Sequence, residues 1–580
     1  MRVLGVNAVF HDSAAALIVD GEVVAAAEEE RFTRRKHAKA CVPFSTWELP
    51  ERAIAWCLEE AGLGPNDLDA VAYSYDPALA DLADNADRSR RPNGVGNVVD
   101  ESAAGDRTAD VATGESGDLI ANAYEGLRTY YVRRLPQFLT SLFGGFDAAK
   151  VHYVRHHVAH AASAYLCAPF ASCATLALDG RGERGSFLAG HVRDGRLEPL
   201  ATVELPHSLG LRYEELTVHL GFVRSSDEYK VMGLAAYGSP RYRERLRAAM
   251  YATGLGYYAP PLDFAAYCAP RRADDEGFAT EHADLAASVQ ERLQEILVDI
   301  AQELHARTGE RNLTLSGGVA LNCVANSYLA EHGPFERIWV QPAAGDAGTA
   351  LGAALYVAAE GGDRIAPLRT AALGRSWDAA QLRAQLDVAN VVYAAPLDLA
   401  EAVAEVLAEN GLVAWFQGRS EFGPRALGHR SLLAHPGYSD NLRRLNDVKG
   451  REQFRPVAPM VLAERAADIF TGPLPSPYML FTHGVRDEWR ARIPTVTHVD
   501  GTARVQTVDA NDEPLMAAVL RAFERRTGLP VLVNTSLNTA GRPIVDEPRD
   551  ALELFGSTPV DALALGPFLL ARRAQLVAAA

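Results

Sequence analysis

Cysteine is scarce in this chain, and its positions follow no metal-binding pattern. Among 580 residues there are six, at Cys41, Cys57, Cys167, Cys173, Cys268 and Cys323. No two are spaced as Cys-x-x-Cys, which argues against a zinc ribbon and a thioredoxin-type redox motif. Sparse, unpatterned cysteine is typical of a reducing compartment, so we expect a cytoplasmic protein.

Long apolar runs and an excess of positive charge are also missing. No stretch of about 18 apolar residues occurs, so no membrane span is predicted, and residues 1–12 lack the apolar core of a signal peptide. The net charge of −17 argues against a broad nucleic-acid surface or an anionic-membrane partner. The 48% hydrophobic content is ordinary for a globular protein, and 580 residues are too many for one core. We therefore expect two or more domains.

The first residues predict a strand, a polar turn and a hairpin. Residues 2–7 form a short apolar run, and a turn carrying His11 follows. Residues 14–27 are typical of a hairpin with Asp20-Gly21 as its two-residue turn. Phosphate-binding sheets of the actin and sugar-kinase type begin in this way. The densely charged residues 28–39 are interpreted as a solvated helix face.

Three later apolar runs end in glycine-containing turns. Residues 173–178 lead into Asp179-Gly180, residues 313–315 into Ser316-Gly317-Gly318, and residues 338–340 into a turn that carries Asp346. Glycine lets backbone N–H groups approach a phosphate closely. Three units of strand, glycine turn and helix predict an α/β sheet with ligand loops at the strand ends.

His156 and His160 are the most informative pair. They lie four residues apart in an alanine-rich run that predicts a helix, so they share one helix face and could hold one metal ion. The alternative is a pair of ordinary surface or core histidines. With Asp179 and Asp346 they would supply two nitrogens and two oxygens, a set that suits iron, manganese or zinc better than calcium. Either aspartate could instead cap a helix.

His11 is the candidate general base, because its turn lies at a ligand-binding position of the predicted sheet. A lone histidine is more often structural, and that alternative stays open.

A second candidate site lies in residues 415–455, which hold eight basic and four acidic side chains in an otherwise acidic chain. Guanidinium groups bind phosphate oxygens bidentately, and the interleaved glycines leave room for close approach. Arg504 and residues 534–538 add further donors. Ion pairs on a solvated helix are the alternative, and they suit Arg443 and Arg444 best.

The domain boundary is predicted where the helical pattern ends, near residues 361–377. We expect a first domain over residues 1–365 and a second over residues 375–580. Residues 81–118 are rich in Asp, Gly, Asn, Ser and Ala, which predicts a mobile insertion at about residues 80–120.

Five runs together resemble the O-carbamoyltransferases of antibiotic and nodulation-factor biosynthesis, of the nodulation-factor, cephamycin and tobramycin type. They are residues 156–161, 230–238, 316–322, 420–428 and 534–538. The resemblance implies an α/β protein of two domains. The first would be an actin-like (ASKHA-type) duplicated α/β domain that holds metal, and the second a YrdC-like α/β domain.

The resemblance also implies an ATP-dependent reaction in two stages. Carbamoyl phosphate and ATP give carbamoyl adenylate in the second domain, with Mg²⁺ accompanying ATP. A hydroxyl-bearing small molecule, such as a sugar or macrolide of a natural product, then takes the carbamoyl group in the first domain beside Fe(II) or another divalent transition metal. Relatives form dimers, which favours a homodimer.

Residue roles follow from the same resemblance. His156, His160, Asp179 and Asp346 match metal ligands, and His11 matches the general base. Lys230 falls within a matched run and is assigned to cofactor binding. The other matched positions are nucleotide contacts and the carbamoyl phosphate and ATP site with its neighbours: Gly180, Gly317, Gly318 and Asn322, then Lys449, Arg455, Arg504 and Ser536, with Arg425 and Arg451 beside them. Relatives commonly carry Ser where this chain has Ala14, so a hydroxyl contact there is in doubt.

Two other functions remain open. An actin-like sugar kinase would explain the first domain but leaves the second basic region unused. A tRNA threonylcarbamoyl-type modification protein is opposed by the acidic charge. Acceptor choice is expected to lie in residues 81–118 and 205–228.

Overall fold

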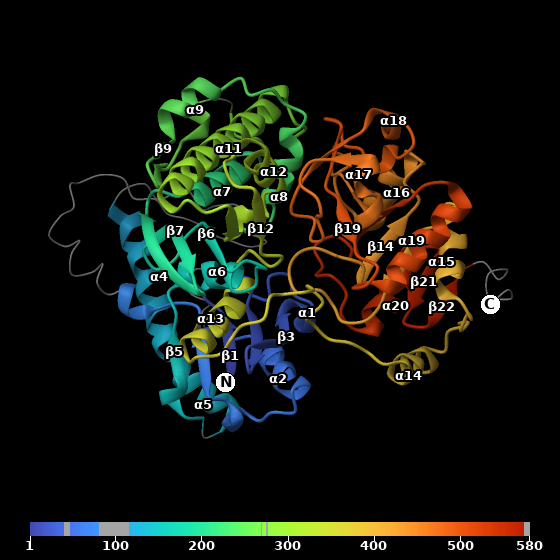
Figure 1. The fold of residues 1–580 in the computed structure, drawn as a ribbon, viewed down its shortest axis with the longest axis horizontal. Coiled ribbons are helices and arrows are strands. Elements are labelled where there is room, and N and C mark those ends of the chain that lie inside the picture. Colours follow the sequence, from blue (N-terminus) through green and yellow to red (C-terminus); the bar gives the residue numbers. More distant parts are fainter. Residues whose placement is uncertain (40–46, 81–114, 145, 268–269, 274–275, 573–580) are drawn as a thin grey trace. The chain divides into compact units, whose positions relative to one another are not determined.

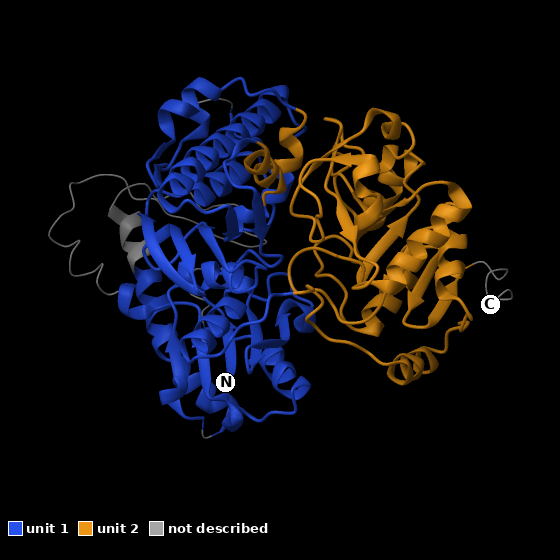
Figure 2. Ribbon diagram, viewed as in Figure 1, with its two compact units in different colours: residues 1–231, 238–321, 332–368 blue, residues 232–237, 322–331, 369–580 orange. Residues whose placement is uncertain are grey.

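The computed structural model describes residues 1–39, 47–80, 115–144, 146–267, 270–273 and 276–572, so most of the predicted insertion lies outside the described residues. The chain divides into two compact units (Figure 2). The first unit contains residues 1–231, 238–321 and 332–368. The second contains residues 369–580 together with two short earlier segments, residues 232–237 and 322–331.

The first unit is built on two five-stranded sheets of the same topology. In the first, β2 and β3 flank β1 on one side as an antiparallel meander, and β4 and β5 continue parallel to β1 on the other. In the second, β7 and β8 flank β6 in the same way, and β11 and β12 run parallel to it. The strands are β1 (Arg2–Asn7), β2 (Ala14–Val19), β3 (Glu22–Glu28), β4 (Ala70–Tyr73), β5 (Val151–Tyr153), β6 (Ser172–Leu178), β7 (Gly185–Arg193), β8 (Arg196–Glu204), β11 (Asn312–Ser316) and β12 (Arg337–Val340). This repeat is the duplication expected of an actin-like domain.

The N-terminal hairpin prediction is confirmed. Strands β2 and β3 pair antiparallel, and Asp20 (φ 51°) and Gly21 (φ 82°) both adopt the left-handed conformation that a tight two-residue turn requires. The prediction that a helix follows the turn at Asp179 is wrong, because β6 continues through this turn into the antiparallel strand β7. Asp179 therefore sits in a hairpin loop.

Two helices lie against the sheets and against each other (Figure 1). Helix α13 (Ala347–Glu360) packs on β1, β2 and β4 of the first sheet, and α6 (His156–Tyr165) packs on β6, β7 and β11 of the second. The two helices contact one another closely: a Cβ added to Gly352 would lie 1.8 Å from the carbonyl oxygen of Ala159. Both helices are lined with small residues, and this permits the close approach.

The interpretation of residues 28–39 as a solvated helix face is wrong. Only a four-residue helix forms there, α1 (Glu30–Thr33), and Glu28, Glu29, Arg31 and Lys39 are buried. Arg31 pairs with Glu28, and the Glu29 carboxylate accepts the backbone N–H of Ala53 at 2.8 Å. Charges can be buried when they are paired and hydrogen-bonded in this way. Part of the charge run thus belongs to the interior of the first unit, whereas the side chain of Arg35 is 49% exposed.

The second unit has a mixed seven-stranded sheet in the order β19-β15-β20-β14-β13-β21-β22. Its strands are β13 (Val413–Phe416), β14 (Arg430–Ala434), β15 (Ala458–Leu462), β19 (Gln506–Val508), β20 (Val531–Ser536), β21 (Ala562–Leu565) and β22 (Phe568–Ala571). Its core surrounds Trp415 and Phe416 and includes residues of α15 (Leu399–Ala408) and α19 (Pro514–Thr527). The second unit is an α/β domain, and its likeness to YrdC stays a prediction. None of the described helices has the length and apolar character needed to cross a membrane.

Candidate metal centre and anion site

Four predicted side chains converge in the first unit. His156 and His160 come from the first two turns of α6, Asp179 follows β6, and Asp346 precedes α13. One ligand atom from each of the four lies within 4.8 Å of those of the others, and all four residues are buried. The predicted helical spacing of the histidines is confirmed, and residues separated by as many as 190 positions meet at one point.

The distances fit a bound ion better than a set of hydrogen bonds. His156 Nε2 lies 3.5 Å from an Asp179 oxygen and 3.6 Å from an Asp346 oxygen, and the corresponding distances from His160 Nε2 are 3.8 and 3.5 Å. These exceed ordinary N–H···O lengths of about 2.9 Å. Four ligands at about 2.1 Å from one ion in tetrahedral geometry would lie about 3.4 Å apart. The donor set matches that spacing.

Hydrogen bonds around the cluster orient its donor atoms inward. The ring Nδ1 of His156 donates to the carbonyl oxygen of Ser74 at 3.1 Å, which leaves its Nε2 lone pair facing the carboxylates. Asp179 accepts the backbone N–H of Gly318 at 3.0 Å with its other oxygen. Such outer contacts fix the tautomer and orientation of metal ligands. Neither Asp346 oxygen has a hydrogen-bond partner within the described chain, and Asp346 does not cap α13.

Orphaned buried groups of this kind are costly unless something binds them. His156 Nε2, both ring nitrogens of His160 and both Asp346 oxygens are buried without a hydrogen-bond partner in the described chain, and with Asp179 they therefore fit a divalent transition metal. The helix-capping alternative for Asp346 is excluded by its geometry.

The protonation equilibria of the ion-free cluster follow from its charges. Burial disfavours the imidazolium of His156, but Asp179 and Asp346 outweigh burial and raise its pKa well above the ordinary value. Burial would also raise the pKa of Asp179, yet His156 and His160 lower it well below its usual range. The neighbouring His157 behaves oppositely, because burial, with His156 beside it, lowers its pKa to about 3. The carboxylates that would bind a metal ion thus also favour a proton on His156 in the ion-free protein.

Glu183, which is not among the predicted site residues, ties α6 to the first sheet. One of its carboxylate oxygens accepts the backbone N–H of His156 and that of Asp76, both at 2.8 Å. Asp76 lies just beyond β4, so one side chain joins the start of the histidine helix to the end of a strand. A carboxylate at a helix N-terminus also interacts favourably with the helix dipole.

His11 lies beside the cluster. Its Nε2 is 3.9 Å from an Asp346 oxygen, its Nδ1 is 3.0 Å from Asp12 Oδ2, and its side chain is 30% exposed. In the ion-free protein, burial opposes the charged form of His11, but the Asp346 and Asp12 carboxylates raise its pKa well above the ordinary value. A cation bound by Asp346 would offset the effect of that carboxylate and favour the neutral imidazole that a general base requires. His11 is therefore placed between the buried donors and an accessible face.

The glycines predicted as nucleotide contacts have identifiable packing. A Cβ on Gly317 (φ 87°) would lie 2.0 Å from the carbonyl oxygen of Leu178, so only glycine fits there. The N–H of Gly318 is used by Asp179, and the carbonyl of Gly180 accepts the Ser208 hydroxyl at 2.7 Å. Lys230 pairs with Asp227 at 2.9 Å.

In the second unit, Lys449 and Ser536 are brought together. Lys449 ends α16 (Asp440–Lys449), and its ammonium donates to Ser536 Oγ at 3.0 Å and to the carbonyl oxygen of Asn538 at 3.3 Å. Arg504 is mostly buried beside Arg455, and this burial lowers its pKa. Arg455 also pairs with Glu452 at 3.5 Å. Buried or partly buried cations such as Lys449 and Arg504 are residue types that bind anionic ligands.

The other predicted residues of this unit are described by their own local contacts or position. Arg451 donates to Asn446 Oδ1 at 2.6 Å, and Asn322 caps the helix that follows it by accepting the N–H of Ala325 at 3.0 Å. Arg425 lies in the glycine-rich loop before β14. The solvated-helix interpretation is confirmed for Arg443, which pairs with Asp440 and Asp447 on the surface.

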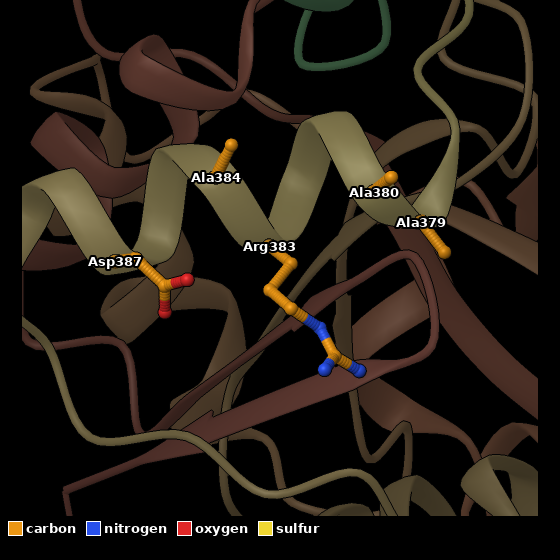
Figure 3. Close-up of a pocket in the computed structure, with 5 residues that line it drawn as sticks. All are labelled: Ala379, Ala380, Arg383, Ala384 and Asp387. Atoms are coloured by element: carbon orange, nitrogen blue, oxygen red, sulfur yellow. The ribbon is translucent and has the colours of Figure 1, made fainter.

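A separate pocket lies along one face of α14 (Ala379–Ala389) in the second unit (Figure 3). It is lined by Ala379, Ala380, Arg383, Ala384 and Asp387, and contains none of the predicted site residues. Arg383 lies over the Phe568 ring at 5.4 Å, and Asp387 accepts the Tyr393 hydroxyl at 3.1 Å. Both charged groups of the pocket thus have partners.

Family models match most of the chain. The model described as "Carbamoyltransferase N-terminus" matches residues 2–355, and the one described as "Carbamoyltransferase C-terminus" matches residues 404–572. An uncharacterized protein of Synechocystis is 36% identical over 99% of this chain and 97% of its own length. Nodulation protein NolNO of Sinorhizobium fredii is 37% identical over 98% of this chain and 80% of its own length.

Nodulation protein U of Sinorhizobium fredii is 32% identical over 93% of this chain and 94% of its own length. Likeness to solved structures is low: the ROK hexokinase from Thermus thermophilus is 17% identical over 62% of this chain and all of its own, with a TM-score of 0.28.

Proposed function

Because the chain belongs to the carbamoyltransferase family and is a carbamoyltransferase, we propose that it is an ATP-dependent O-carbamoyltransferase that works through carbamoyl adenylate. The observation that carries the proposal is the convergence of two histidines and two aspartates beside His11 in the first unit, in a chain that also buries Lys449 beside Ser536 in the second.

The first stage is assigned to the second unit. Water cleaves carbamoyl phosphate to carbamate and phosphate, and a carbamate oxygen attacks the α-phosphorus of ATP, which releases pyrophosphate and leaves carbamoyl adenylate. Lys449, Arg455 and Arg504 would bind the phosphate oxygens, and Ser536 would hold Lys449 in place. Mg²⁺ would accompany ATP.

The second stage is assigned to the first unit. The hydroxyl oxygen of the acceptor forms a bond to the carbamoyl carbon, the bond between that carbon and the phosphate oxygen breaks, and AMP leaves. An alcohol is a poor nucleophile, so it needs a base for its proton. His11 Nε2 is proposed to accept that proton, because His11 is partly exposed and borders the cluster.

His156, His160, Asp179 and Asp346 are proposed to hold a divalent transition metal, Fe(II) among the candidates. When bound, such an ion supplies a Lewis acid at the reacting group. The chain's own contribution is to keep four donors buried and oriented, through Ser74 on His156 and Gly318 on Asp179.

The acceptor is proposed to be a hydroxyl-bearing small molecule, a sugar or macrolide hydroxyl of a natural product. Two relatives are named as nodulation proteins, which supports a sugar-containing acceptor. The charge of −17 disfavours a polyanion.

The test measures carbamoyl-phosphate-dependent exchange of labelled pyrophosphate into ATP by the full chain. We expect exchange that requires carbamoyl phosphate and Mg²⁺, followed by AMP release when hydroxyl compounds are supplied. Exchange that is absent in metal-loaded protein would overturn the adenylate route. Formation of ADP with a sugar, in place of AMP, would support the kinase alternative.

A further inference from the structure

Four side chains, of which His11 is the first, are joined by a series of hydrogen bonds. His11 Nδ1 lies 3.0 Å from Asp12 Oδ2, Asp12 Oδ1 lies 2.7 Å from His37 Nδ1, and His37 Nε2 lies 3.0 Å from Ser226 Oγ. The four residues come from three distant segments of the first unit, since 25 positions separate Asp12 from His37 and 189 separate His37 from Ser226. Each contact has the length of a good hydrogen bond.

The backbone at the first two segments is strained and held in place. Asp12 (φ 50°), His37 (φ 61°) and Ala38 (φ 68°) all adopt the left-handed conformation that non-glycine residues rarely use. Asn7 donates to the carbonyl oxygens of His11 and Asp12, both at 3.1 Å. Such strain persists only where the surroundings enforce it, and it gathers at functional sites.

Further bonds anchor the His37 loop from both sides. The backbone N–H of His37 donates to a Glu30 carboxylate oxygen at 2.8 Å. The ammonium of Lys39 donates to the carbonyl oxygen of Ala8 at 2.6 Å, and this links the loop directly to the turn that carries His11. These contacts hold the imidazole of His37 against Asp12.

The third segment is fixed by its own carboxylates. Asp227 accepts the N–H of Val223 at 3.1 Å, and Glu228 accepts the N–H of Ser225 at 2.8 Å, where Ser225 is itself left-handed (φ 55°). Ser226 immediately precedes these two acidic residues. The turn thus presents the Ser226 hydroxyl to His37.

We infer that His37 is a positioning residue, which holds Asp12 so that the Nδ1–H of His11 is fixed and its Nε2 lone pair is free to receive the acceptor's proton. Asp12 orients the base as the aspartate of a catalytic triad orients its histidine, and His37 with Ser226 orients Asp12. The inference rests on the proposed role of His11 and adds three residues to it. It also connects the base to the segment in which acceptor choice is expected.

The test uses the full metal-loaded chain and three variants. His37→Ala removes the donor to Asp12, and His37→Asn keeps an N–H near the position of Nδ1. Ser226→Ala removes the hydroxyl that contacts His37 Nε2. The matched control is His191→Gln, because His191 is another buried histidine of the first unit that contacts a carboxylate, Glu310, at 2.8 Å. Pyrophosphate exchange reports the first stage, and AMP release with water as the acceptor reports the second.

We expect His37→Ala to lower kcat for AMP release by about 10- to 100-fold, the usual loss when an outer partner of a site is removed. KM for ATP and carbamoyl phosphate, pyrophosphate exchange and metal content should stay as in the wild type. Ser226→Ala should lose about fivefold, the value of one hydrogen bond. His37→Asn should recover most of the kcat that His37→Ala loses.

Wild-type kcat in His37→Ala would overturn the inference, and so would equal losses in His37→Ala, His37→Asn and His191→Gln, which would indicate general destabilisation. These results differ from failure of the proposed function, in which the wild-type chain itself shows no pyrophosphate exchange.

Discussion

Replacing Gly352 by alanine should damage the metal centre without touching any of its donors. Gly352 lies in α13, two turns beyond Asp346, and faces Ala159 of α6, which lies between His156 and His160. An added Cβ would stand 1.8 Å from the Ala159 carbonyl oxygen, and real Cβ contacts are essentially never below 3.0 Å. The two helices would have to separate by about 1.2 Å at this point.

Helix α13 has no room to retreat. On its other side, the carbonyl oxygen of Ala350 approaches Gly5 of β1 so closely that a Cβ on Gly5 would lie 1.9 Å away. Overpacking of this kind costs about 1–3 kcal/mol and sometimes more. Metal ligands tolerate displacements of only about 0.2 Å, so a shift of α13 against α6 should lower metal affinity by about 100-fold.

The assay pairs calorimetric titration of Zn²⁺ into the ion-free chain with thermal unfolding. Gly126→Ala is the matched control, because Gly126 lies in helix α4 (Glu115–Arg133) with nothing within 4 Å of an added Cβ. That change should raise stability by about 0.5–1 kcal/mol and leave the affinity unchanged. Wild-type affinity and Tm in Gly352→Ala would refute the reasoning.

Three further outcomes are expected. His160→Ala should abolish stoichiometric binding of a divalent transition metal, measured by elemental analysis after dialysis, because it removes one of four buried donors; retained stoichiometry would contradict the assignment. Lys449→Met should reduce pyrophosphate exchange at least about 100-fold while metal content is preserved, and exchange at the wild-type rate would remove Lys449 from the anion site. Burial lowers the pKa of His435 to about 4, so stability should be full above the ordinary pKa of 6.5 and fall as the pH drops from there toward 4. Urea unfolding should show that the free energy of unfolding of the wild type is about 1 kcal/mol lower at pH 5 than at pH 7.5, and that this difference is smaller in His435→Asn. Equal differences in the wild type and the variant would count against the role of His435.

Local pattern predicted the features whose physical cause is local. The alternation and turn residues of the hairpin at Asp20-Gly21 follow from nearby residues, and so does the helix that carries His156 and His160. Asp179 and Asp346 could be placed together because each ends a strand of one sheet region, although Asp179 lies in a hairpin and not before a helix.

The features that escaped prediction depend on long-range contacts. The charges of residues 28–39 resemble a solvated surface in sequence, and the burial of Glu29 and Lys39 depends on their distant partners Ala53 and Ala8. Asp12, His37 and Ser226 share no periodicity or motif, so nothing in the sequence could align them with His11. Glu183 likewise acquires its place only when β4 and α6 meet.

The arrangement of α6 and α13 has a consequence for how the first unit folds. Helix α6 follows the last strand of the first sheet yet packs on the second, and α13 follows the last strand of the second sheet yet packs on the first. Each half of the duplication therefore completes its partner's core, and neither half should fold alone. A cation bound by residues of α6 together with Asp346 before α13 would hold the two helices together. It would raise the free energy of unfolding of the first unit by about 2.7 kcal/mol when free metal is at 100 times Kd.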